Sequence, residues 1–194
     1  MSDIASLILA AALVNSAVFI QLLGVSAVAN FSERLQPAID IALFTAVVLI
    51  LSSTINQLLF WFVLSPLGLE MLKLIVFVVI SSILTTVLAI IVRKNFKLTA
   101  RQQPIEFYLA GINSAVVGLS LLNSSITPSL TNFFNTVAVS AGSALGFAFV
   151  LIGLGAIKIR LTTSDAPDAL RNNPIMLTSA GIAAMGFLGF TGLF

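Results

Sequence analysis

Cysteine and histidine are both absent from this chain of 194 residues. Their absence excludes disulfides, thiolate chemistry, haem ligation by histidine, and any ordinary zinc or iron–sulfur site built by this chain alone. The sequence also lacks a Ser–His–Asp set, paired carboxylates and a glycine-rich phosphate loop. We therefore expect no catalytic residue, no metal site and no cofactor bound by this chain alone.

Charge is equally scarce. Only 8% of the residues are charged and 59% are hydrophobic, whereas an ordinary soluble domain is about 25% charged. Such a chain cannot cover a globular surface with polar groups, so we identify it as an integral membrane protein in contact with lipid. The net charge of +2 is too small to indicate nucleic acid. The N-terminus has no basic region and no small-residue cleavage site, so we interpret it as a first membrane helix and not a removable signal.

Six apolar segments have the length of about 20 residues that a membrane helix needs. They lie near residues 4–29, 38–64, 70–92, 105–123, 132–157 and 174–193. We predict an all-α membrane protein of six transmembrane helices, forming a single membrane domain over residues 1–194.

Lysine and arginine predict the orientation, because short cytoplasmic loops carry an excess of both. Apart from Lys73, all of the basic residues fall in the first, third and fifth loops: Arg34; Arg93, Lys94, Lys97 and Arg101; Lys158, Arg160 and Arg171. The second and fourth loops hold none. We therefore expect both termini on the non-cytoplasmic side of a prokaryotic-type inner membrane or a related energy-transducing membrane.

The four residues Asn-Ser-Ala-Val occur at Asn15–Val18 and again at Asn113–Val116. Each copy lies inside the first apolar segment of one half of the chain, and each is followed by a glycine. Three helices in each half make the second half inverted relative to the first. Two similar polar interruptions in inverted halves are typical of a site near the bilayer midplane. We predict two inverted three-helix repeats, about 1–97 and 98–194.

Several stretches spread over the chain form a pattern that is more specific than hydropathy. They are Val14–Ser26, Phe31–Leu35, Val92–Lys94, Asn113–Val116 with Leu121–Asn123, and Leu170–Ile175 running to Gly189–Leu193. Together they resemble the A subunit of the Rnf electron-transport complex, which is related to subunits D and E of the sodium-pumping NADH:quinone reductase. The resemblance spans nearly the whole chain.

This resemblance implies six helices in two inverted repeats, with helices 1 and 4 broken in mid-membrane. It also implies a homologous sister subunit, and cysteines at the two breaks that hold an intramembrane iron–sulfur cluster with the sister. Here those positions read Ser26 and Ser114. Because clusters are held by thiolates, the scaffold is expected to be kept and the redox centre lost. The altered neighbours Ala27–Ala29 favour a divergent homologue over an engineered pair of serines.

Geometry adds an expectation about the first break. Counted from Ile4, Ser26 would lie about 33 Å along a straight helix, whereas Ser114 is only about 14 Å into the fourth. The two can meet near the midplane only if the first helix breaks or re-enters, and we expect the break around Asn15 to Gly24. Freed backbone groups must then be satisfied inside the protein.

Five further residues are expected to stabilise the two helix breaks. Asn15, Ser16 and Asn113 could pair with freed backbone groups, and Gly24 and Gly111 could relieve the backbone. The alternative is ordinary packing, in which the asparagines form interhelical hydrogen bonds and the serines are small residues at tight crossings.

Other polar and small residues have simpler interpretations. Asp40 follows Pro37 closely, so it either complements a helix start or is a functional intramembrane acid. We place Asn56 and Gln57 at the membrane interface and Trp61 in an aromatic belt. The stretch Gly142–Gly146 has the small-xxx-small spacing of close helix packing.

Two functions remain open. One is a membrane subunit of an Rnf/Nqr-type electron-transport, ion-translocating complex, without its own iron–sulfur cluster and acting through other integral membrane subunits. The alternative is a cluster-free paralogue that serves as a structural or assembly subunit of a different respiratory or photosynthetic complex, or a small carrier.

Overall fold

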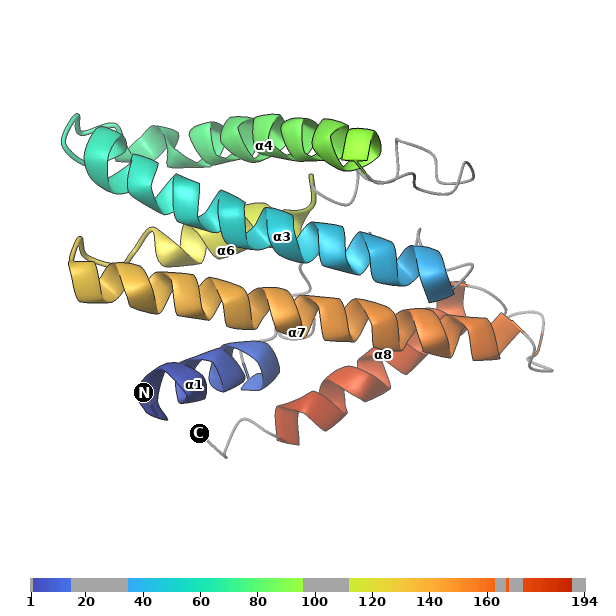
Figure 1. The fold of residues 1–194 in the computed structure, drawn as a ribbon. Coiled ribbons are helices and arrows are strands. Elements are labelled where there is room, and N and C mark those ends of the chain that lie inside the picture. The colour runs from blue at the N-terminus through green and yellow to red at the C-terminus, as the bar shows by residue number, and fades with distance from the viewer. Residues whose placement is uncertain (1, 15–34, 96–111, 163–166, 168–172, 190–194) are drawn as a thin grey trace.

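The fold was analysed in a computed structural model, which describes residues 2–14, 35–95, 112–162, 167 and 173–189 (Figure 1). All regular structure within these ranges is helical. In chain order the helices are α1 (Ser2–Leu9), η1 (Ala10–Val14), α3 (Leu35–Leu59), η2 (Phe60–Leu64), η3 (Glu70–Leu72), α4 (Lys73–Asn95), α6 (Ser114–Asn123), α7 (Leu130–Thr162) and α8 (Asn173–Leu188). η1 and η2 are π-helices, and η3 is a turn of 3₁₀-helix that leads into α4.

Three of the described helices are long and apolar enough to cross a bilayer. These spans are Ile39–Leu64, Glu70–Val92 and Leu130–Leu161, of 26, 23 and 32 residues. Each exceeds the roughly 20 residues needed to span the hydrocarbon core. The predicted segments 38–64, 70–92 and 132–157 are thereby confirmed as helices, and the chain is an all-helical membrane protein over the residues described.

Helix α7 is the centre of the bundle. It packs most extensively against α3, and it also contacts α1, η1 and α8. Figure 1 shows α3 and α7 running in opposite directions, with α1 and α8 on the side of α7 away from α4. In the most apolar stretch of α7, 61% of the residues are buried, against 17% for α4. Helix α4 therefore offers most of its surface to lipid or to another protein of the membrane.

The apolar core lies between α3, α6 and α7. Its fully buried side chains include Ile41 and Val48 of α3, Val116 of α6, and Phe147 and Leu151 of α7. Lipid tails are as apolar as these side chains, so the helices are held by close packing and interhelical hydrogen bonds more than by the hydrophobic effect.

The small-residue stretch Gly142–Gly146 allows α7 to make close contact with α1 and η1. A Cβ atom built on Gly146 would lie 3.0 Å from the carbonyl carbon of Ala12 and closer still to its oxygen. One built on Gly142 would lie 2.8 Å from Cβ of Ala11 and closer to the carbonyl oxygen of Ile8. The predicted packing role of these glycines is confirmed, since α1 and η1 approach α7 where no side chain fits.

A tight turn joins η2 to η3. The amide of Ser65 donates to the carbonyl of Phe60 at 2.9 Å, which closes the last π-turn. Gly68 has φ of 68°, a left-handed conformation that favours glycine. The predicted turn at residues 65–68 is confirmed. We call this end of the bundle, with the turn 65–68 and the loop 124–129, the turn end.

Two predicted segments are described only in part. Of segment 4–29 the described part is α1 and η1, and of segment 105–123 it is residues 112–123, with a helix that begins at Ser114. α8 covers most of segment 174–193. The arrangement as six spans in two inverted repeats stays a prediction.

Candidate functional site

Buried polar side chains from several neighbouring helices meet in the middle of the bundle. Helix α3 carries Ser52, Ser53, Asn56 and Gln57, all with 0% of their surface exposed. Side chains four residues apart lie on the same face of a helix. The pairs Ser52/Asn56 and Ser53/Gln57 therefore form two adjacent polar faces on one apolar helix.

The first face forms the Asn56 cluster, which consists of Ser52, Asn56, Ser81 and Ser120. The Asn56 side-chain nitrogen lies 2.9 Å from Oγ of Ser120, 3.2 Å from Oγ of Ser81 and 3.3 Å from Oγ of Ser52. The hydroxyls of Ser52 and Ser81 lie 2.6 Å apart. One amide thus joins α3 to α4 and α6.

Ser120 fixes the orientation of the Asn56 amide. Its hydroxyl donates to the carbonyl of Val116 at 2.9 Å, so toward Asn56 it can only accept. The Asn56 Nδ2 group must therefore face Ser120. The amide oxygen then points elsewhere, and among the described residues Oδ1 has no hydrogen-bond partner.

The second face contributes to the Asn123 cluster of Ser53, Asn123 and Ser140. The Asn123 amide donates to Oγ of Ser53 at 2.6 Å and to Oγ of Ser140 at 3.0 Å. The two hydroxyls lie 3.0 Å apart. Both N–H groups of Asn123 are satisfied, and the cluster joins α3 and α6 to α7.

Next to these clusters, two buried side chains lack partners. Within the described part of the chain, both polar atoms of Gln57 and the hydroxyl of Thr136 have no hydrogen-bond partner, although the residues are 0% and 1% exposed. A buried polar group without a partner costs about 1–3 kcal/mol, so these atoms call for a physical explanation.

Our placement of Asn56 and Gln57 at the membrane interface is wrong, because both are fully buried between helices. The polar residues of the two clusters, Asn56 included, were not predicted from the sequence as site residues. The signal that could have found them is the repeat of serine and amide side chains one turn apart, at 52/56 and 53/57 on α3.

Asn113 begins helix α6. Its side-chain oxygen accepts from the amides of Ala115 at 2.8 Å and Val116 at 3.2 Å. Its backbone is extended, with φ of −115° and ψ of 162°, as an N-cap requires. The residue is 7% exposed, so two helix-end amides are satisfied inside the protein.

The other predicted site residues are placed as follows. Ser114, the first residue of α6, is exposed on the surface of the isolated chain. Asn15, Ser16, Gly24, Ser26 and Gly111 lie outside the described residues. Whether Ser26 and Ser114 come together therefore stays a prediction. Asp40 lies in the second turn of α3, just beyond the helix start that Pro37 indicated.

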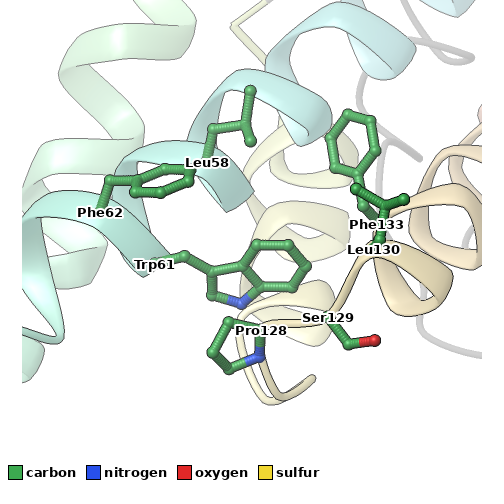
Figure 2. Close-up of a pocket in the computed structure, with 7 residues that line it drawn as sticks. All are labelled: Leu58, Trp61, Phe62, Pro128, Ser129, Leu130 and Phe133. Atoms are coloured by element: carbon green, nitrogen blue, oxygen red, sulfur yellow. The ribbon is translucent and has the colours of Figure 1, made fainter.

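A shallow apolar cavity of about 410 Å³ lies at the turn end. It is lined by Leu58, Trp61, Phe62, Pro128, Ser129, Leu130 and Phe133. Figure 2 shows the Trp61 ring across its middle, with the nitrogen edge toward Pro128. The indole N–H donates to the carbonyl of Ile126 at 2.9 Å, tying η2 to the loop 124–129.

The chemistry open to this arrangement is limited by its charge. Both clusters contain only neutral amides and hydroxyls, with no acid, base or activated nucleophile among them. Across the described residues no group of three or more His, Cys, Asp or Glu side chains could hold a metal ion. Hydrogen bonding between helices, and binding of small polar species, are what these groups can do.

Comparison with known proteins gives the family. The sequence model of one protein family, described as "Rnf-Nqr subunit, membrane protein", matches residues 4–194 of this chain. The chain belongs to the Rnf-Nqr family. The resemblance seen in the sequence is thereby confirmed over nearly the full length of the chain.

Individual members of the Rnf-Nqr family agree with this result. The chain is 34% identical to the A subunit of the ion-translocating oxidoreductase complex of Alkalilimnicola ehrlichii, over 100% of this chain and 98% of that one. It is 33% identical to the corresponding A subunit of Pseudoalteromonas atlantica and 32% identical to that of Hahella chejuensis, with the same coverage. The matched region includes all three long spans and the residues of both polar clusters.

Proposed function

We propose that this chain is a membrane subunit of an ion-translocating oxidoreductase complex of the Rnf/Nqr type, and that it acts as a scaffold through its partner subunits. The observation that carries the proposal is similarity, over 100% of this chain, to proteins named as the A subunit of such complexes. The exposed surface of α4, with only 17% of its apolar stretch buried, supports contact with other integral membrane subunits, including a homologous sister subunit.

We further propose six membrane spans in two inverted repeats, with both termini on the non-cytoplasmic side of an inner membrane. Helix α6 supports a break in the fourth span. Its 10 residues cover about 15 Å at 1.5 Å per residue, half of a hydrocarbon core of about 30 Å. It starts at a buried Asn113 cap, so its end needs no water. The first span would be broken between Asn15 and Gly24.

An iron–sulfur cluster does not fit the residues of this chain. The positions that match the family's cysteines are Ser26 and Ser114, and the sequence contains no cysteine or histidine. Neutral serine hydroxyls do not replace thiolates as iron ligands. The function we propose therefore includes no electron transfer through a cluster held by this chain.

Co-purification tests the proposal. A tagged copy, expressed at its native level and extracted in mild detergent, should recover subunits that oxidise NADH or ferredoxin. An unrelated tagged membrane protein of the same host serves as the control. Recovery with a different respiratory or photosynthetic complex, or recovery alone, would favour the cluster-free paralogue, an alternative that the missing cysteines support.

Metal analysis of the purified chain tests the proposed loss of the iron–sulfur cluster. The chain, separated from its partners, should contain far less than one iron per molecule. Stoichiometric iron in the separated chain would contradict the proposed loss of the redox centre.

A further inference from the structure

We propose that Gln57 and Thr136 form a buried water-binding site between α3 and α7. The site consists of the Gln57 side-chain amide and the Thr136 hydroxyl, all of whose polar atoms are unpaired within the protein. The site does not depend on the proposed function of the chain.

The neighbouring contacts place the two residues together. Ser53 of α3 and Ser140 of α7 are in contact, with their hydroxyl oxygens 3.0 Å apart. The two helices run in opposite directions (Figure 1). Gln57 lies one turn beyond Ser53, and Thr136 lies one turn before Ser140, so both steps lead toward the turn end. One helical turn advances 5.4 Å along the helix axis. Gln57 and Thr136 are therefore expected at the same level of the bundle, one turn closer to the turn end than Ser53 and Ser140.

Ser140 also bonds to the preceding turn of its own helix, the turn that carries Thr136. Its hydroxyl donates to the backbone carbonyl of Thr136 at 2.8 Å. The Thr136 carbonyl is therefore occupied by this bond, whereas its own hydroxyl is not paired. The cavity lined by Leu58 and Phe133 lies farther along the same two helices, toward the turn end.

The unpaired atoms identify the ligand by what they need. The Gln57 amide nitrogen has two hydrogens to donate, the amide oxygen can accept, and the Thr136 hydroxyl can do both. A water molecule can accept from the nitrogen and donate to the oxygens, and buried waters typically make about three such bonds. Water can therefore pair with both the hydrogen-bond donors and the acceptors of this site.

A cation fits these atoms poorly. It would satisfy the oxygens but leave the amide hydrogens of Gln57 unpaired. It would also bring an uncompensated charge into the bundle, which is costly in a medium of low dielectric constant. The carboxylate on the same helix, Asp40, is about 25 Å from Gln57 along the axis at 1.5 Å per residue.

Water-edited solid-state NMR of the full chain in lipid bilayers tests the site. Magnetisation transferred from water should reach the Gln57 side-chain amide several-fold faster than the Asn123 amide. Asn123 is the matched control, because it is also buried, with 3% of its surface exposed, and donates both N–H groups to protein atoms. The dipeptide Asn56-Gln57 occurs once in the sequence, so pairwise isotope labelling assigns the signal without any substitution.

Two results of this experiment would overturn the proposal. Equally slow transfer to both amides would mean a dry layer or a direct bond between Gln57 and Thr136. A shift of the Gln57 amide signal on replacing Na⁺ by K⁺ at constant ionic strength would mean a cation in place of water.

A double-mutant cycle gives an independent measurement. Gln57→Met and Thr136→Val each remove a partner of the water, so each should lower the melting midpoint, and the pair should lower it by less than the sum. The control is Thr86→Val on the exposed face of α4, where the hydroxyl donates only to its own helix at 2.9 Å. A dry site predicts the opposite sign, because Gln57→Met would then remove an unsatisfied group and raise the midpoint.

Discussion

Replacing Gly146 by alanine should separate helix α7 from the N-terminal segment. The added Cβ would lie 3.0 Å from two backbone carbons of Ala12, whereas ordinary contacts begin at 3.4 Å. Backbone atoms cannot rotate away as a side chain can, so α1 and η1 must move outward. The shift must exceed the roughly 0.4 Å that would relieve the carbon contacts, because the Ala12 carbonyl oxygen lies closer still. Such overpacking typically costs about 1–3 kcal/mol.

The higher helix propensity of alanine opposes this cost. Whether Gly146→Ala lowers or raises the stability of the protein therefore shows which effect is larger. Alanine in a helix interior is favoured over glycine by up to about 1 kcal/mol. Gly153, on the same helix, has no atom within 4 Å of a built Cβ. Gly153→Ala should therefore be neutral or stabilising, and Gly146→Ala should be destabilising.

The assay is thermal unfolding of the purified variants in detergent, followed by circular dichroism. A free-energy difference of about 1–3 kcal/mol between the two variants corresponds to roughly 2–12 °C in melting midpoint for a chain of this size. Gly142→Ala should fall on the same side as Gly146→Ala. If Gly146→Ala is as stable as Gly153→Ala, the close approach of α1 to α7 is not present in the protein.

Three further predictions follow from the helix cap and the membrane arrangement. Asn113→Ala should destabilise the protein by about 0.5–2 kcal/mol through loss of the cap, whereas Asn113→Ser should restore most of it; equal stabilities would refute the capping role. Ser2→Cys and Thr99→Cys should react with an impermeant maleimide from opposite sides of the membrane, and labelling from one side would exclude the proposed topology. A Ser26→Cys, Ser114→Cys double variant should be cross-linked by a short bifunctional thiol reagent, and failure to cross-link would argue against two broken spans that meet.

Hydropathy predicts the long spans within a few residues, because the hydrocarbon core demands an apolar run of fixed length. It predicts helix ends less well. Helix α7 continues to Thr162, beyond the predicted end at residue 157. Lys158 and Arg160 are good helix formers, so the charged residues that end the apolar run do not end the hydrogen bonding of the helix.

The buried polar clusters illustrate what hydropathy does not reveal. Lipid-facing and protein-facing sides of a membrane helix are both apolar, so the sequence carries little information on how α3 is rotated. The sequence gives the positions of Asn56 and Gln57 along the helix, but it does not show whether their side chains face lipid or protein. Asparagine is among the best N-cap residues, yet only the structure shows that a helix begins at Asn113. The remaining site residues, Ser26 among them, lie outside the described residues.

The polar groups of α3 also imply an order of events during synthesis. Asn56 precedes Ser81 by 25 residues but Ser120 by 64. Ser53 precedes its partners Asn123 and Ser140 by 70 and 87 residues. At about 5–20 residues per second, the last of these partners emerges roughly 4–17 s after Ser53.

During those seconds α3 and α4 can pair through Ser52, Asn56 and Ser81, while the face with Ser53 and Gln57 has no protein partner. Until α6 and α7 have been synthesised, Ser53 lacks the hydrogen bonds that it later forms with Asn123 and Ser140. The Asn123 cluster, which joins α3 to α6 and α7, can therefore form only after most of the second half of the chain has been made.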